Sequence, residues 1–96
     1  MKEKGIEEYL RTEVKKLGGK AYKWVSPGNN GVPDRLVCLP KGIKLLVELK
    51  APGKKPTKLQ VKRQNELTRL GNHVFNIDSK HLVDEFIKSC KVLLGL

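Results

Sequence analysis

Residues 31–50 read GVPDRLVCLPKGIKLLVELK, and this stretch decides the fold. Two apolar runs, in which neighbours such as Leu36 and Val37 fall on alternate faces, flank Pro40-Lys41-Gly42. Such a pattern is typical of two strands joined by a tight turn. It predicts a β-hairpin with strands at residues 34–39 and 43–50. Gly42 suits a three-residue loop because glycine adopts positive φ without steric cost.

The length of this loop fixes which residues of the two strands face each other. It pairs Leu39 with Ile43, and Asp34 then lies directly opposite Glu48 with both carboxylates on one face. Opposed residues have Cβ atoms about 4.5–5.5 Å apart, so two carboxylates there repel unless a cation or a proton lies between them. Lys50 shares the face of Glu48, whereas the apolar residues of the second strand line the other face.

Oxygen ligands of this kind favour a hard ion, which predicts Mg²⁺ with Mn²⁺ as a substitute. Zinc is not expected. Cys38 and Cys90 are too scattered for a zinc ribbon or a disulfide framework and are predicted to be buried thiols. His73 and His81 lack metal-ligand spacing with them.

Pro33-Asp34 followed by Glu48-Leu49-Lys50 resembles the PD-(D/E)xK nuclease signature. Taken without its context, the same motif also fits a turn aspartate and two charges at an exposed strand end. The context GGKAYKWVSPGNNGVPDRLVCLP, followed by VELKAPGKKPTKLQ, resembles the VRR-NUC (virus-type replication-repair nuclease) family over roughly residues 5–79.

The resemblance implies one nuclease domain over residues 1–96 that hydrolyses phosphodiester bonds in DNA. It also implies a PD-(D/E)xK core, an α/β fold in which a small mixed sheet of about four strands is flanked by helices in the order α-β-β-β-α-β-α. Small members of this kind are similar to homodimeric Holliday-junction resolvases, which cut four-way DNA junctions.

Site roles follow from the same resemblance. Asp34, Glu48 and the backbone carbonyl of Leu49 are expected to bind the metal. Lys50 positions or deprotonates the attacking water or contacts the phosphate, and these options stay open. Gln60 corresponds to a glutamine that orients site groups, although a helix-capping box explains it equally well. Some related nucleases have tyrosine at the position of Gln64, so the role of Gln64 is open.

The N-terminal segment predicts an amphipathic helix over residues 3–17, because Ile6, Leu10 and Val14 recur at helical spacing before Gly18-Gly19. Glu7 lies at the edge of this apolar stripe and can approach the sheet. By resemblance it is a third metal-binding carboxylate. A boundary glutamate in an ion pair fits the position equally well.

The remaining elements are predicted from local patterns. Residues 20–26 form a strand that carries Trp24, either in the core or a dimer interface or stacked on a base. A helix capped by Thr57 runs to about Leu70, with Gln60 facing the sheet, and residues 73–78 form a strand that can pair in parallel. The buried stripe of this helix is expected to comprise Leu59, Leu67 and Leu70.

Ser79 is expected to cap a last helix. This helix has a broad apolar face, which either packs within the chain or forms a subunit interface. The face comprises Leu82, Val83, Phe86, Ile87, Cys90, Leu93 and Leu94.

Charge indicates a polyanionic partner, since 20 Lys and Arg residues against 10 Asp and Glu residues give a net charge of +10. Polar and basic residues near the proposed site are expected to contact DNA, although ordinary turn chemistry or a solvated loop also accounts for them. They are Ser26, Asn29, Asn30, Arg35, Lys54, Lys55 and Lys58. No apolar run long enough to span a membrane and no signal peptide is visible, so an intracellular location is expected. The family resemblance suggests a bacterial or phage-infected cell.

These observations predict a Mg²⁺-dependent, structure-selective endonuclease, in the first instance a homodimeric Holliday-junction resolvase. The alternatives are a non-catalytic, architectural DNA-binding protein and a monomeric flap or nicking nuclease. Catalysis is favoured because two facing carboxylates in a basic surface weaken phosphate binding unless they bind a metal.

Overall fold

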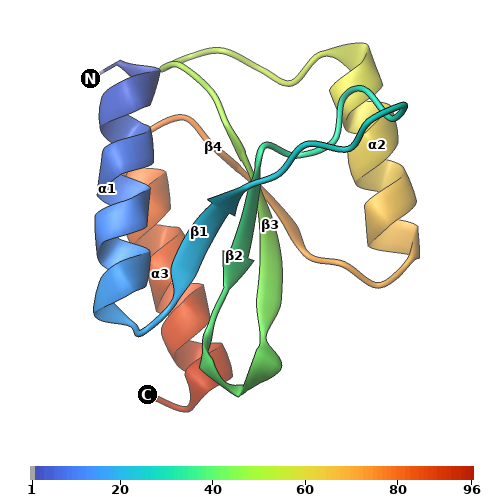
Figure 1. Cartoon of the computed structure of the whole chain (residues 1–96). Helices are drawn as coiled ribbons and strands as arrows, with labels where there is room; N and C mark the ends of the chain where they lie inside the picture. The colour runs from blue at the N-terminus through green and yellow to red at the C-terminus, as the bar shows by residue number, and fades with distance from the viewer. Residues whose placement is uncertain (1) are drawn as a thin grey trace.

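The computed structural model describes residues 2–96, in which helices cover both faces of a four-stranded mixed sheet (Figure 1). The elements are α1 (Glu3–Lys16), β1 (Lys20–Lys23), β2 (Arg35–Cys38), β3 (Lys44–Leu49), α2 (Lys58–Arg69), β4 (Val74–Ile77) and α3 (Lys80–Leu94). A single 3-10 turn at Pro40–Gly42 joins β2 to β3. The predicted order α-β-β-β-α-β-α is confirmed.

The strand order is β1-β2-β3-β4, so β1 and β4 form the two edges of the sheet. β1 pairs with β2 and β2 with β3 in antiparallel fashion. β4 pairs with β3 in parallel, as expected for a strand that follows a helical crossover.

The register of the β2–β3 hairpin is the predicted one. Arg35 pairs with Val47 and Cys38 with Lys44, while Leu39 N donates to Ile43 O at 2.8 Å and closes the loop. Gly42 has the expected positive φ of 74°, and Lys41 also has a positive φ, of 68°. The tight turn therefore requires two left-handed residues, of which the sequence pattern indicates only one.

The hydrophobic core lies between the sheet and the pair α1 and α3, which lie together on one side of it (Figure 1). Ile6, Leu10 and Val14 of α1 are fully buried there. α3 buries most of its broad apolar face in the same core, so packing within the chain accounts for these residues. They are Val83, Phe86, Ile87, Cys90 and Leu94.

α2 lies over the opposite face of the sheet (Figure 1), and none of its residues is buried. The predicted buried stripe is wrong, because Leu59 is 42% exposed, Leu70 is 80% exposed and Leu67 is only half-buried. The sheet surface below the helix carries polar side chains, and Gln60 and Gln64 hydrogen-bond to them. Polar contacts thus replace the expected apolar ones.

Cys90 is buried as predicted, but Cys38 is only half-buried, so the expectation for Cys38 is wrong. Its neighbours Val37 and Leu39 point into the core, and strand alternation therefore directs Cys38 to the less covered face. Trp24 is also half-buried. Among residues 2–96, no helix is both long and apolar enough to cross a membrane.

Candidate active site

Asp34 and Glu48 meet where β2 begins and β3 ends. The hairpin register continues one step beyond Arg35 and Val47, which places Asp34 opposite Glu48 on the face covered by α2. Asp34 is fixed from both sides: its Oδ1 accepts a hydrogen bond from Leu49 N at 3.2 Å, and its backbone carbonyl accepts one from Trp24 N at 2.8 Å. The predicted pair of opposed carboxylates is therefore present.

Both carboxyl groups are poorly hydrated. Glu48 is only 3% exposed and is the one buried charged residue in the part of the chain that the structure describes. Burial, followed by the negative charge of Asp34, raises the pKa of Glu48 to about 7. Burial also raises the pKa of Asp34, although the hydrogen bond from Leu49 N opposes the shift. Two such groups are costly to ionise together without a nearby cation.

Two other side chains contact the same oxygen of Glu48. Lys50 Nζ lies 3.5 Å from Glu48 Oε2, and Gln60 Nε2 donates to that atom at 3.1 Å. Gln60 also completes the capping box of α2, since its Oε1 accepts from Thr57 N at 2.9 Å and Thr57 Oγ1 accepts from Gln60 N at 3.2 Å. The structure thus contains both contacts that the sequence suggested for Gln60. Its Nε2 contacts a site carboxylate, and its Oε1 takes part in the helix cap.

Gln64 does not contact the carboxylates. Its side-chain amide forms two reciprocal hydrogen bonds with that of Asn76, at 2.8 and 2.9 Å. Asn76 in turn is the neighbour of Glu48 in the parallel β3–β4 register. Sequence reasoning missed Asn76, because the length of a helical crossover does not fix the register of the strand that follows.

Glu7 forms an ion pair with Arg35, which is the second of the two alternatives that the sequence left open. The side chain of Arg35 is 11% exposed and that of Glu7 is 33% exposed. Among residues 2–96, no group of three or more His, Cys, Asp or Glu side chains is arranged to hold a metal ion. The structure therefore brings together Asp34 and Glu48 but not a third carboxylate.

The loop between β1 and β2 is organised by its own turn. Asn29 N donates to Ser26 O at 3.0 Å, and Asn29 Nδ2 donates to Ser26 Oγ at 3.2 Å. Arg63 Nε of α2 donates to Asn30 O at 2.8 Å, which ties this loop to the helix. Ser26 is half-buried, whereas both asparagines are exposed.

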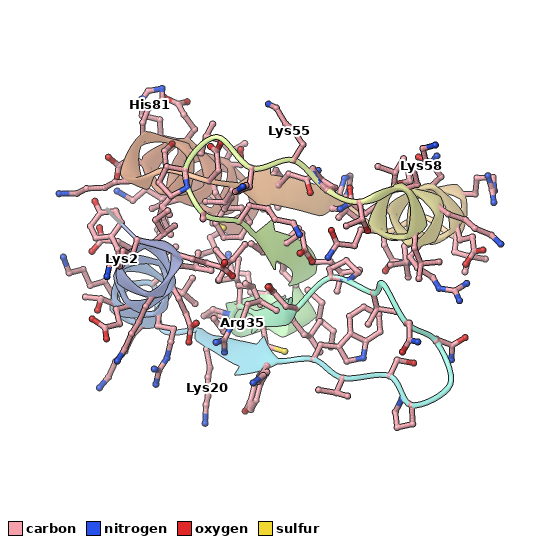
Figure 2. All side chains as sticks on the ribbon, turned by 90° about the horizontal axis from the view of Figure 1, so that it is seen from above. Lys2, Lys20, Arg35, Lys55, Lys58 and His81 are labelled. Atoms are coloured by element: carbon pink, nitrogen blue, oxygen red, sulfur yellow. The ribbon has the colours of Figure 1, made fainter. Side chains whose placement is uncertain are left out.

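The basic loop after β3 lies on another side of the site. Lys54, Lys55 and Lys58, the first residue of α2, are all exposed. Asp78 Oδ2 anchors the loop of Lys54 and Lys55 by accepting a hydrogen bond from Gly53 N at 3.2 Å. Figure 2 shows Lys55 and Lys58 on the opposite side of Arg35 from Lys20. The acidic pair is therefore bordered by positive charge.

The donor set is chemically suited to a hard divalent cation. Two carboxylates face each other, both with raised pKa values, and a positive charge between them relieves the repulsion that burial makes expensive. Oxygen ligands of this type select Mg²⁺ or Mn²⁺ over zinc. The residues present thus fit such an ion.

Comparisons with known proteins identify relatives of this chain. No family model matches the chain. "Putative nuclease p44" from Acyrthosiphon pisum secondary endosymbiont phage 1 is 52% identical over 82 residues, which cover 85% of this chain and 88% of the phage protein. A solved structure described as "VRR_NUC domain" is 31% identical with a TM-score of 0.83, over 92% of this chain and 97% of that one.

Proposed function

The chain belongs to the VRR_NUC family of nucleases, and from this premise we propose that residues 1–96 form one domain that acts as a Mg²⁺-dependent, structure-selective DNA endonuclease. The observation that carries the proposal is the buried Glu48 opposite the half-buried Asp34, within a chain of net charge +10. A basic surface attracts DNA, whereas an acidic pair within it has a use only if a metal ion binds there.

Asp34 and Glu48 are the proposed ligands of Mg²⁺, or of Mn²⁺ in its place, with the backbone carbonyl of Leu49 as a further oxygen donor. A bound ion supplies Lewis acidity, which makes water more acidic and stabilises the extra negative charge of the attacked phosphate. Glu7 adds a third carboxylate only if its ion pair with Arg35 opens.

Lys50 and Gln60 complete the proposed site. The ammonium group of Lys50 lies 3.5 Å from Glu48 Oε2, beside the acidic pair, where it reaches the attacking water or the scissile phosphate. A positive charge at that place stabilises the negative charge that develops during hydrolysis. Gln60 holds the carboxylate of Glu48 in one orientation through its 3.1 Å hydrogen bond.

DNA contacts are assigned to the surroundings of the acidic pair. Lys54, Lys55 and Lys58 are exposed and free to bind phosphates by charge, which adds affinity without base specificity. Ser26, Asn29 and Asn30 belong to a turn whose polar groups offer hydrogen bonds to the backbone. Arg35 lies beside Asp34, and its contact with DNA requires that it leave Glu7.

The substrate that we propose is a four-way DNA junction, cut by a homodimer with one site for each of two strands. Two exposed apolar side chains on one side of the helix support a subunit contact, namely Leu59 of α2 and Leu70 at its C-cap. Such a phage-like enzyme would act in the cytoplasm of a bacterial cell, on branched DNA. Gel filtration, combined with cleavage of labelled junctions, flaps and linear duplexes, tests the substrate and the dimer. Equal cutting of all three DNAs by a monomer would contradict both.

A second candidate is a DNA-binding architectural protein without catalysis. It is favoured by one observation, the ion pair that holds Glu7 away from a three-carboxylate cluster. This candidate predicts junction binding in EDTA and no cleavage when Mg²⁺ is added. It leaves the burial of Glu48 beside Asp34 without a purpose, and nuclease activity is therefore the preferred function.

A further inference from the structure

A groove of about 830 Å³ runs between α1 and the edge strand β1, outside the acidic pair. Arg11 and Lys15 border it from the helix, and Lys20 and Lys23 border it from the strand. We call this surface the α1–β1 groove. None of the residues to which DNA contacts are assigned above borders it, except Arg35.

Positive charge dominates the α1–β1 groove. Five cationic residues line it, of which all but the half-buried Arg35 are exposed, and the one carboxylate that lines the groove is that of Glu8. Among residues 2–96, no carboxylate lies within salt-bridge distance of Arg11, Lys15, Lys20 or Lys23. Like charges gathered around one concave surface repel each other and attract an anion from solution.

The groove reaches the strand that begins beside Asp34. Arg35 lines it and directly follows Asp34 in the chain, but side chains alternate along a strand, so Arg35 points towards Glu7 of α1 while Asp34 lies on the face covered by α2. Figure 2 shows Lys20 on one side of Arg35 and Lys55 on the other. Basic residues therefore lie on both sides of Arg35, with the loop of Lys55 on one side and Lys20 of the α1–β1 groove on the other.

The spacing of the charges fits a polymer of phosphates. Arg11 and Lys15 are one helical turn apart, about 6 Å along the axis, and Lys20 and Lys23 are about 10 Å apart along an extended strand. Phosphates of one strand in duplex DNA recur about every 3.4 Å along the axis. The two cations of each element are therefore far enough apart to contact different phosphates of one backbone.

We propose that the α1–β1 groove binds the phosphate backbone of DNA, on the side of the cut site away from Lys54 and Lys55. The inference rests on the proposed nuclease function, which it extends by naming a second contact surface for the same substrate. DNA held on both sides of Asp34 and Glu48 is fixed in direction as well as in position, which favours one phosphate for cleavage.

Binding in EDTA tests the groove without any need for catalysis. Two groove variants are compared with the wild-type chain, Arg11→Gln with Lys15→Gln and Lys20→Gln with Lys23→Gln. A matched control removes the same charge elsewhere, as Lys88→Gln with Lys91→Gln on the exposed side of α3. The dissociation constants for a labelled four-way junction and for a linear duplex are measured at salt concentrations from about 50 to about 300 mM. Binding through phosphate contacts weakens steeply over such a range.

Each groove variant is expected to bind at least about tenfold more weakly, with the slope of log affinity against log salt reduced by about 1.8, since each lost phosphate contact removes about 0.9. The control is expected to keep the wild-type slope. Equal effects in the groove and control variants would show that the groove residues act only through the net charge of the protein. That result would overturn the proposal. Unchanged binding by the groove variants, or binding of an acidic protein rather than DNA, would also overturn it.

The groove and the nuclease site fail in different ways. If the wild-type chain cuts DNA while the groove variants bind as tightly as the control, the groove assignment is wrong and the nuclease assignment stands. If DNA binding depends on the groove but Mg²⁺ produces no cleavage, the groove stands and the nuclease assignment is wrong.

Discussion

Gln60 Nε2 donates a hydrogen bond to Glu48 Oε2 at 3.1 Å, while Oε1 of the same side chain accepts one from the backbone amide of Thr57. One amide therefore joins the first turn of α2 to a carboxylate of the candidate active site. Because α2 buries none of its own side chains, polar contacts of this type are what position the helix over the site.

Gln60→Glu separates the two contacts. A glutamate still accepts the hydrogen bond of the capping box, but it presents a carboxylate rather than a donor to Glu48. We expect single-turnover cleavage to fall about 10- to 100-fold, as for other partners of metal ligands. Thr57→Ala is the control, because it removes the cap at a cost of about 1 kcal/mol and leaves the contact with Glu48 possible. Wild-type cleavage by Gln60→Glu, together with reduced cleavage by Thr57→Ala, would show that Gln60 acts only through the helix cap.

Gln64 and Asn76 are expected to stabilise the placement of α2 through their paired amides. A double-mutant cycle with Gln64→Ala and Asn76→Ala is expected to give a coupling free energy of about 1 kcal/mol in urea unfolding, the usual net value for partly exposed hydrogen bonds. Asn65→Ala, at an exposed position of the same helix, serves as the control for Gln64. Additive effects of the two substitutions would contradict the paired arrangement.

The metal-free protein is expected to lose stability as the pH rises from about 5 to 8. Burial and the charge of Asp34 raise the pKa of Glu48 from 4.5 to about 7, so between these values the folded state binds more protons than the unfolded state. The stabilising contribution is complete below the lower value and is lost as the pH passes the upper one. At about 1.4 kcal/mol for each pKa unit, the loss is on the order of 3 kcal/mol.

Urea unfolding in EDTA at pH 5 and pH 8 measures this dependence. The Glu48→Gln protein has no titratable group at residue 48. Its free energy of unfolding is therefore expected to change less between the two pH values than that of the wild-type chain. Mg²⁺ added at pH 8 is expected to stabilise the wild-type protein, because a ligand that binds only the folded state shifts the equilibrium towards it. The same pH dependence in both proteins would mean that Glu48 is not the buried acid.

Lys54→Ala combined with Lys55→Ala is expected to weaken junction binding and to flatten its salt dependence, because both lysines are exposed beside the site. The slope of log affinity against log salt is expected to fall by nearly two for two lost contacts. The Lys88→Gln and Lys91→Gln protein provides the matched charge control. A wild-type slope in the Lys54 and Lys55 variant would assign both side chains to solvent.

The hairpin was predictable because its information is local. A three-residue loop pairs Leu39 with Ile43, and every later pair in the two strands follows, up to Asp34 and Glu48. The faces of the strands follow as well, since side chains alternate without exception along regular strands. The two facing carboxylates then predicted a hard divalent cation, and family resemblance added the Leu49 carbonyl as a ligand and the role of Gln60 in orienting site groups.

The features that were missed depend on how distant elements pack. The predicted burial of the apolar stripe of α2 was wrong because helical periodicity shows which residues share a face. It does not show whether an apolar surface lies opposite that face. Asn76 was missed because the parallel register of β3 and β4 is set across a crossover. The partner of Glu7 was left open for a similar reason, since either a metal or Arg35 satisfies a carboxylate at the edge of a helix.

The central claim is that Asp34 and Glu48 use a divalent cation to cut DNA. The most direct measurement incubates a labelled four-way junction with the wild-type chain and with Asp34→Asn, each in Mg²⁺ and in EDTA, and follows both cleavage and binding. The account predicts cleavage only by the wild-type chain in Mg²⁺, with junction binding retained by the Asp34→Asn variant. Undiminished cleavage by that variant, or a wild-type chain that binds the junction and never cuts it in Mg²⁺, would contradict it.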